Sequence, residues 1–409
     1  MLLLLIINLL LLLTLSSSYI ELDVYENYGT YDLLVRIGLH SYWKMLELGM
    51  DMEFLYICVH DLNPKDPEIH FTNEIVNINI SNTALNLEKV YSSLYFNKQG
   101  NIDYIFTTNN NNNVNVSYGF NIPHIPLLYS KIALVSTFDT FPLAHTYTNT
   151  SLSIIHLLKH NKHISKLSFA LYCHYKAHKG KLYLGGLPTT ILHAFPYSAS
   201  VPVGNNINYW GTTLTSVIVN DNNIYTVNNN VRFSYTERHI RVPMEFIEWM
   251  KLHVFNRYIA DGKCRYNNWY PEKRFTCDEL VNDFPNITFN FQGIEIVFHK
   301  EILFKKQYEQ SYEFEIYGND KLTTQNEWIL GNGFLTYKLL EFNYETNHIT
   351  FYSNELTKGM NIHTITTNTI TTLNNIKRIL IFNIIYISIY TLFLFIKYIN
   401  INKESSTKN

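Results

Sequence analysis

Short runs of β-branched and aromatic residues, cut by Gly, Asn and Pro, repeat from Tyr31 to about Asn354. Many such runs in succession predict an all-β sandwich or barrel. The clearest runs are Tyr31–Ile37, Leu167–Cys173, Lys181–Leu184, Thr213–Val219, Ile287–Phe291 and His348–Phe351. Helical periodicity is clearest at Leu152–His160 and Pro243–Tyr258, the second with Pro at a predicted first helical position. With 409 residues, the chain has room for one large all-β domain or for two lobes.

Charge and composition exclude several functional classes. Only 16% of the residues are charged, the formal net charge is −2, and no block of Lys and Arg occurs, so no surface for nucleic acid is predicted. Aromatic residues make up 15% of the chain, which is too many for a disordered protein. The signatures of P-loop, dinucleotide-binding and G-x-S-x-G proteins do not occur. We therefore predict no cofactor.

The two ends of the chain are apolar. Met1–Leu15 is almost entirely Leu and Ile and is followed by three serines, which is typical of a secretory signal peptide, although a basic first region is lacking. We predict a signal peptide over residues 1–18, and the alternative is a retained N-terminal anchor. Near the other end, Ile379–Ile396 runs for eighteen residues without a charge. As a helix it would span about 27 Å, which is enough to cross a membrane.

The C-terminal apolar segment is predicted to be a transmembrane helix, and the alternative is a buried core helix. Lys377, Arg378 and Lys397 flank it as interfacial anchors. Residues 358–378 are rich in Thr and Asn and are expected to form a stalk, and residues 397–409 a short tail. The chain is thus expected to be a single-pass type I membrane protein of the secretory pathway or cell surface, with its bulk in the lumen or outside.

A secretory compartment would permit disulfides, and the chain has four cysteines. Cys264 and Cys277 lie close together in a polar stretch and are predicted to pair. A bridge between Cys58 and Cys173 would be long-range, and the sequence leaves it open. N-glycosylation sequons occur at Asn79, Asn115, Asn149 and Asn286, and we expect about half of them to be used.

A series of short motifs follows in a fixed order through the second half of the chain. They are Lys181–Gly186, Val201–Val203, Tyr209–Trp210, Leu214–Val219, Phe284–Phe289, Trp328–Leu335, Glu341–Asn343 and His348–Phe351. In this order and at these spacings the set resembles the pepsin-like aspartic proteases (peptidase A1). The LSFALYC stretch that ends at Cys173, the later cysteine pair and the C-terminal anchor together resemble membrane-bound parasite proteases of the plasmepsin V type.

The resemblance implies an all-β, bilobal fold with a peptide cleft between the lobes. The N-terminal lobe would cover residues 19–195 and the C-terminal lobe residues 196–357, related by a pseudo-twofold axis. It also implies two catalytic carboxylates, one from an Asp-Thr/Ser-Gly triplet in each lobe. Two carboxylates this close cannot both ionise, so one acts as base toward water and the other as acid toward the substrate carbonyl.

Neither predicted catalytic position holds a carboxylate. In the first half, Tyr31 to Ile37-Gly38 matches the family, and counting onward from Ile37-Gly38 places the first triplet at Gly49–Asp51. Counting back from Pro243, where the second predicted helix begins, places the second triplet at Ser234–Thr236. Gly49 has no side chain, and the Ser234 hydroxyl cannot act as a base without a partner. The apolar-apolar-Gly stretch of each lobe is expected at Lys131–Leu134, where the glycine is missing, and at Ile329–Gly331.

Three functions remain open from the sequence. The first is a non-catalytic homologue of aspartic proteases that binds peptides or proteins in the interlobe cleft or serves as a scaffold. The second is a divergent aspartic endopeptidase in which the register slips, so that Asp51 acts with an unidentified second acid. The third is a surface antigen or adhesion protein in which the cleft has no role.

Three histidines have the spacing of a metal-binding helix face. His156, His160 and His163 lie at positions i, i+4 and i+7. They are opposite Leu152, Ile155 and Leu158, so the simpler interpretation is the solvated face of an amphipathic helix. We therefore predict no metal site.

Overall fold

The computed structural model describes residues 19–27, 30–37, 42–50, 55–58, 75–80, 83–97, 102–106, 118–130, 140–145, 153–174, 178–204, 209–220, 223–269, 272–307, 311–319, 327–335, 338–362 and 391. Between residues 51 and 139 the description covers the backbone of the strands. Met1–Ile362 forms one compact unit and His363–Asn409 a second. No helix in the described ranges is long and apolar enough to cross a membrane. The predicted signal peptide lies outside these ranges, as does Ile379–Ile396 apart from Thr391.

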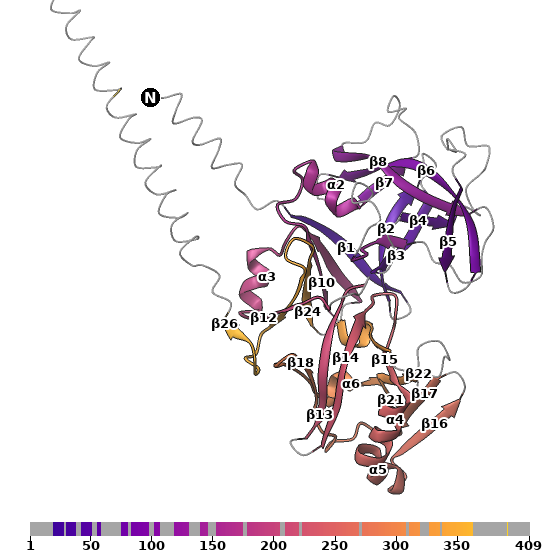
Figure 1. Cartoon of the computed structure of the whole chain (residues 1–409), viewed down its shortest axis with the longest axis vertical. Coiled ribbons are helices and arrows are strands. Elements are labelled where there is room, and N and C mark those ends of the chain that lie inside the picture. Colours follow the sequence, from indigo (N-terminus) through magenta and orange to yellow (C-terminus); the bar gives the residue numbers. More distant parts are fainter. Residues whose placement is uncertain are drawn as a thin grey trace, which may run out of the picture. The chain divides into compact units, whose positions relative to one another are not determined.

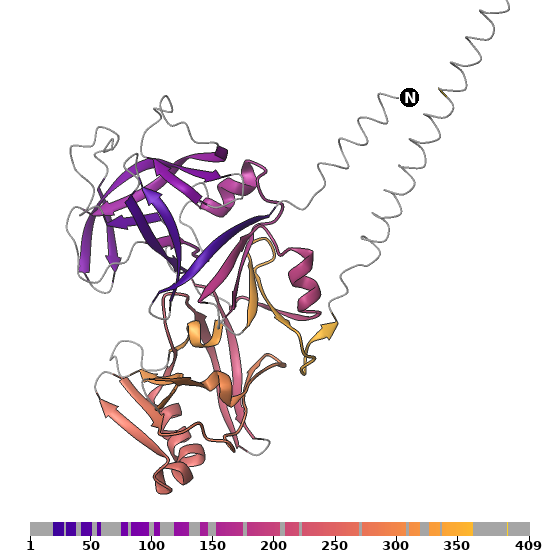
Figure 2. The ribbon, with the colours of Figure 1, turned by 180° about the vertical axis from the view of Figure 1, so that it is seen from behind.

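The first unit contains a 15-stranded sheet (Figure 1). Its strands, in spatial order, are β26 (Asn361–Ile362), β12 (Tyr197–Pro202), β25 (His348–Ser353), β24 (Leu339–Asn343), β10 (Ser168–His174), β11 (Lys179–Leu184), β1 (Ile20–Asn27), β2 (Thr30–Ile37), β3 (Tyr42–Gly49), β9 (Thr140–Pro142), β4 (Leu55–Cys58), β8 (Tyr118–Ser130), β6 (Thr83–Asn97) and β5 (Ile75–Ile80). β7 (Ile102–Phe106) pairs with β2 and β6. Strands from both ends of the unit therefore share this sheet, as Figure 2 shows from behind.

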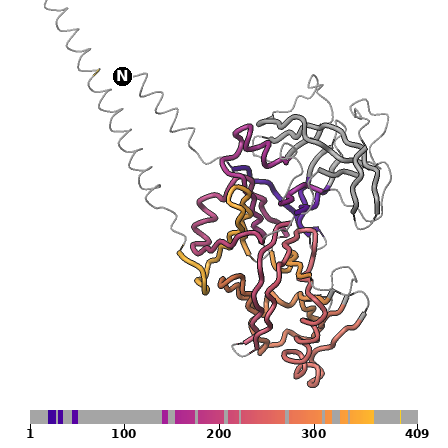
Figure 3. The backbone as a smooth tube through the Cα atoms, in the orientation of Figure 1, coloured from indigo at the N-terminus to yellow at the C-terminus, as the bar shows by residue number. Residues whose placement is uncertain are grey.

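A second sheet of 11 strands follows β12 in the chain. Its spatial order is β19 (Ile294–Phe298), β18 (Ile287–Phe291), β13 (Gly211–Val219), β14 (Asn223–Phe233), β23 (Trp328–Leu330), β15 (Ile240–Pro243), β22 (Ile316–Asn319), β17 (Glu272–Cys277), β21 (Tyr312–Phe314) and β20 (Phe304–Lys306). β16 (Cys264–Trp269) pairs with β17. The backbone tube in Figure 3 follows the long hairpin of β13 and β14.

The described helices are short. They are α2 (Ile154–His160), α3 (Thr189–Ala194), α4 (Met244–Met250), the π-helix η2 (Lys251–Phe255), α5 (Asn256–Ala260), α6 (Lys300–Leu303) and α7 (Asn332–Leu335). Pro243 is the N-cap of α4 rather than its first helical residue, because its ψ of 147° is extended. The helix predicted over Pro243–Tyr258 is real, but a π-helical turn separates its two α-helical parts.

The predicted strands are confirmed, but the predicted boundaries differ in two places. β12, β24 and β25, which were assigned to the C-terminal lobe, pair within the first sheet. The predicted stalk begins too early, because β26 pairs with β12 and the Lys358 ammonium lies 2.9 Å from a Glu295 carboxylate oxygen. Residues 358–362 therefore belong to the folded unit.

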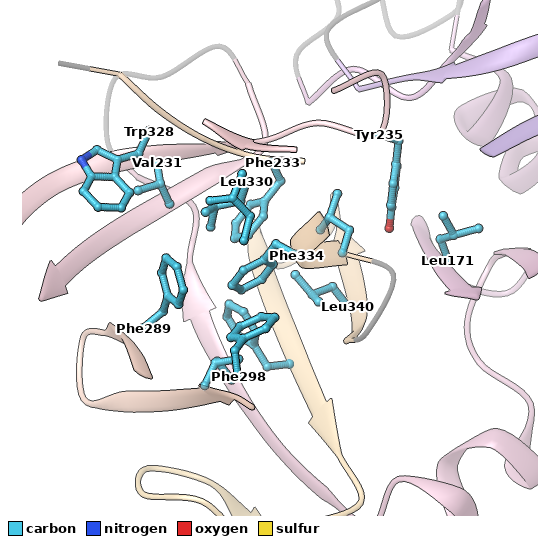
Figure 4. Close-up of a cluster of buried hydrophobic side chains, with 14 of the residues drawn as sticks. Leu171, Val231, Phe233, Tyr235, Phe289, Phe298, Trp328, Leu330, Phe334 and Leu340 are labelled. Carbon is cyan, nitrogen blue, oxygen red and sulfur yellow. The ribbon is translucent and has the colours of Figure 1, made fainter. Parts of the chain in front are cut away.

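The core is built from alternating strand residues and from aromatic rings. Ile287, Phe289 and Phe291 of β18 are buried and alternate with more exposed neighbours, as expected for a strand with one face on the core. Figure 4 shows Phe289, Phe298 and Phe334 near one another inside this core. The larger cluster of buried residues includes members of both sheets, so one hydrophobic core extends across them in the described part of the chain. A smaller cluster is formed by Ala170, Leu339 and Tyr352.

Candidate functional site

In the first sheet, a short strand holds Gly49 in place. β9 pairs in parallel with β3, where Gly49 lies opposite Pro142, and antiparallel with β4, where Tyr56 lies opposite Thr140. The backbone N–H of Leu143 donates to the carbonyl oxygen of Gly49 at 2.8 Å. Gly49 is thus a buried residue at the end of a strand, fixed by hydrogen bonds to the segment that contains β9.

The second sheet repeats this arrangement around Ser234. β23 pairs in parallel with β14, where Phe233 lies opposite Leu330, and antiparallel with β15, where Arg241 lies opposite Ile329. The backbone N–H of Ser234 donates to the carbonyl oxygen of Leu330 at 3.2 Å. Ser234 therefore follows its strand at the point where the chain turns away from β23.

Gly49 and Ser234 occupy equivalent positions in the two arrangements. In each arrangement a middle strand, β9 or β23, pairs in parallel with the strand that leads to Gly49 or Ser234, which is β3 or β14. The same middle strand pairs antiparallel with the next strand along the chain, β4 or β15. Gly49 lies seven residues before Tyr56, which pairs with the middle strand, and Ser234 lies seven residues before Arg241, which does the same. The two positions reached by counting along the sequence are therefore related by the topology as well.

The middle strand of the first arrangement is not the predicted one. This place was predicted at Lys131–Leu134, and the pairing gives it to Thr140–Pro142 instead. The expected apolar-apolar-Gly pattern does not occur there, because Pro142 stands opposite Gly49 in place of a glycine. Proline fits there because β9 is only three residues long and needs few backbone donors.

Ser234 has a hydroxyl partner and no acid partner in the described chain. Its side chain is buried, with 6% of the residue exposed, and its Oγ lies 3.0 Å from the Oγ1 of Thr236. The nearest acid in sequence, Glu237, is held in an ion pair with Arg241 at 2.8 Å. Asp51, the fallback catalytic acid, lies outside the described residues. The described side chains here provide hydroxyl groups and no proton-sharing pair.

Tyr235 fills the space next to Ser234. Its ring is 1% exposed and packs edge-on against Phe342 at a centroid distance of 6.3 Å. Its hydroxyl hydrogen-bonds with the backbone of Leu171 on β10, and burial raises the pKa of Tyr235. Figure 4 shows the ring standing between the second sheet and Leu171. Tyr235 therefore fastens the loop that carries Ser234 to the first sheet.

Gly331 permits a close backbone crossing behind the same loop. A Cβ at this position would lie 2.3 Å from the carbonyl oxygens of both Glu237 and His239. The next residue, Asn332, donates from its backbone N–H to the Glu237 carbonyl at 2.7 Å and from its side chain to the Tyr235 carbonyl at 2.7 Å. The loop is thus fixed from two directions, by Tyr235 and by the turn after β23.

A buried polar cluster underlies the loop and was not predicted. The His239 ring stacks on Tyr317 at 3.9 Å, and its Nδ1 lies 3.2 Å from the Glu315 carboxylate. The Lys305 ammonium is 3.4 Å from the other oxygen of Glu315, which is 1% exposed. Glu313 and Glu315 flank Phe314, and polar residues that alternate with an apolar residue are expected to face solvent. The sequence pattern therefore predicts an exposed Glu315, whereas Glu315 is buried.

The cysteines divide into one pair and one free thiol. Cys264 and Cys277 form a disulfide with an S–S distance of 2.13 Å, as predicted, and lie opposite each other on β16 and β17. Cys173 is free and buried, and burial raises the pKa of its thiol. Among the described side chains Cys173 has no disulfide partner, and the side chain of Cys58, with which the sequence left a bridge open, lies outside them.

The structure describes only some of the predicted surface features. Asn286 is exposed and its side-chain oxygen lies 3.0 Å from the Nδ1 of His299. Asn79 lies on β5, and Asn115 and Asn149 fall outside the described residues. Of the three histidines, His156 lies on α2 with its ring 5.6 Å from that of Tyr344, and burial lowers its pKa.

Comparisons with known proteins agree with this architecture. The family model described as eukaryotic aspartyl protease matches residues 129–353, which is more than half of the chain. Basic 7S globulin from soybean has a similar structure, with a TM-score of 0.60 and 12% identity over 83% of this chain and 96% of that one. An aspartic proteinase from Irpex lacteus gives a TM-score of 0.58 and 10% identity over 85% and 99% of the two chains. No curated protein matches the sequence significantly.

Proposed function

We propose that this chain, which belongs to the eukaryotic aspartyl protease family, is a member that binds peptide or protein segments without cleaving them. One observation carries the proposal. Gly49 and Ser234 lie at equivalent registers in the two sheets, where the family resemblance expects the two aspartates, and neither residue has a carboxyl group. The family's strand arrangement is kept, and these two positions lack the acid–base pair.

The chemistry of the family explains why this loss would be decisive. Hydrolysis by a carboxylate pair needs one group to take a proton from water while the other gives one to the peptide carbonyl. A glycine supplies neither group. A serine hydroxyl with only Thr236 as a described side-chain partner has no base to activate it. Glu237 is the nearest acid in sequence to Ser234, and its ion pair with Arg241 keeps its carboxylate occupied.

The cellular setting is part of the proposal and rests on the sequence. A signal peptide over residues 1–18 would bring the chain into the secretory pathway, and Ile379–Ile396 would anchor it in a membrane. The folded unit would then stand in the lumen or outside the cell. A binding protein held at a membrane surface could present or retain peptide segments there.

The test is a direct comparison of binding and cleavage. The full chain, purified in detergent, is titrated with fluorescent peptides and with a transition-state peptide inhibitor, and cleavage is assayed from about pH 4 to 7. Saturable peptide binding without turnover is the expected result. Inhibitor-sensitive cleavage that disappears in Asp51→Ala would establish a divergent endopeptidase instead. Absence of both binding and cleavage would favour an antigen or adhesion role, in which the cleft has no part.

A further inference from the structure

We propose that Asp32 and Glu47 share one proton in the folded protein, so that the folded unit is more stable at mildly acidic pH than at neutral pH. The two residues lie directly opposite each other on the antiparallel strands β2 and β3. Side chains at directly opposed positions have Cβ atoms about 4.5–5.5 Å apart. This inference is independent of the proposed function.

Both side chains lie on the same face of the first sheet, away from its hydrophobic core. Leu33 and Leu46, one residue along each strand, are opposite each other and buried in the core, so alternation places Asp32 and Glu47 on the other face. Asp32 is nevertheless only 1% exposed, and Glu47 is partly buried. Two carboxyl groups are thus brought together with limited access to water.

The hydrogen bonds favour placing the charge on Asp32 and the proton on Glu47. The side-chain amide of Asn27 donates to one Asp32 oxygen at 2.7 Å, and the Thr30 hydroxyl, which donates to the Asn27 carbonyl oxygen at 2.8 Å, lies 3.4 Å from the other. No described side chain forms a hydrogen bond or ion pair with Glu47. Burial and the charge of Asp32 raise the pKa of Glu47 to about 7, and burial also raises the pKa of Asp32. Because the two groups interact, they titrate as a pair.

The described neighbours offer no cation that would neutralise the pair. Tyr25 of β1 lies opposite Asp32, and Thr140 of β9 lies opposite Glu47. The Lys179 ammonium on β11, which is separated from β2 by β1, lies over the Tyr25 ring at 5.7 Å from its centroid. The cationic residues of the pair's own strands, Arg36 and Lys44, have side chains outside the described part of the chain. Glu26, the next residue on β1, lies opposite Tyr31 and is in an ion pair with His178. Among the described groups, proton uptake is therefore the way to relieve the repulsion.

The sign of the pH effect follows from the raised pKa. An unfolded Glu has a pKa of 4.5, so between about pH 4.5 and 7 the folded protein holds a proton that the unfolded chain has lost. Stability from this pair is fully present below pH 4.5 and is lost as the pH rises through about 7. Glu47 also lies two residues before Gly49, so the change in charge occurs close to one of the two positions where the family resemblance expects an aspartate.

The experiment follows the urea unfolding of the purified full chain between pH 5 and pH 8, which gives the unfolding equilibrium constant at each pH. In the wild type the unfolding equilibrium constant should rise by at least about tenfold over this range, allowing for the partial exposure of Glu47. Glu47→Gln keeps the size of the side chain but cannot titrate, and it should remove this pH dependence. The matched control is Glu21→Gln on the neighbouring β1, whose carboxylate is paired with Lys181 at 2.8 Å and which should follow the wild type.

A second measurement keeps the inference testable if Glu47→Gln does not fold. Carboxyl-carbon NMR of the labelled wild-type chain should show one glutamate that titrates near pH 7. If every glutamate titrates near its ordinary value, or if Glu47→Gln keeps the pH dependence of the wild type, the inference is overturned.

Discussion

Replacing Tyr235 by phenylalanine removes one buried hydroxyl that joins the two sheets. The ring is 1% exposed, and its hydroxyl is the partner of the Leu171 backbone. Leaving such a buried group unpaired costs about 1–3 kcal/mol, so Tyr235→Phe should lower the free energy of unfolding by that amount. Tyr235→Thr also removes the ring and leaves a cavity, and the loss should reach about 3–5 kcal/mol. Urea unfolding of the purified chain measures both.

The control is a tyrosine whose ring packs similarly but whose hydroxyl has no described hydrogen-bond partner. Tyr225 is half-buried, with its ring 5.0 Å from that of Phe246 and 5.4 Å from that of Trp249. Tyr225→Phe should change the free energy of unfolding by less than about 0.5 kcal/mol. If Tyr235→Phe is no more destabilising than Tyr225→Phe, the assigned role of the Tyr235 hydroxyl in fastening the loop is refuted.

Three further changes test other parts of the site. Gly331→Ala places a Cβ 2.3 Å from two carbonyl oxygens and should lower the free energy of unfolding by about 3 kcal/mol or more. Gly262→Ala is the comparison: its Cβ would have open space, but the φ of +70° should cost about 1 kcal/mol. Thermal unfolding compares the two variants. Ser234→Asp puts a carboxylate where the residue is 6% exposed, so the variant should lose about 1–3 kcal/mol at pH 7 and less at pH 4, where the added group is protonated. An equal loss at both pH values would contradict this reasoning. Replacing both Cys264 and Cys277 by serine opens a loop with a sequence separation of 13 and should cost about 3 kcal/mol in urea unfolding.

Local features of this protein were predictable from the sequence. The strand Ile287–Phe291 has alternating apolar residues and a preceding proline, and its boundaries agree with those of β18. Cys264 and Cys277 are close in sequence, so their pairing needs only a hairpin. The positions Gly49 and Ser234 could be reached by counting from Ile37-Gly38 and from Pro243, and each lies seven residues before a residue that pairs with the middle strand, Tyr56 or Arg241.

Features that depend on distant contacts were not predictable. β9 has three residues, too few for a periodic signal, and its identity follows only from its two neighbours in the sheet. The burial of Glu315 depends on His239, which precedes β15, and on Lys305 of β20. That Asp32 lies opposite Glu47 follows only from the register in which β2 pairs with β3. A shift of that register by one residue would place Glu47 on the opposite face of the sheet.

The first sheet also has a consequence for how the chain is made. β10 pairs with β24, so Ala170 meets Glu341 only after the ribosome has synthesised nearly all of the folded unit. Until β24 and β25 emerge, one edge of β10 and the whole of β12 lack their sheet neighbours. Such contacts between distant residues form slowly and leave strand edges open to aggregation. A chain terminated before Leu339 should therefore be a target for chaperones and proteases, even though it contains Gly49, Ser234 and Gly331.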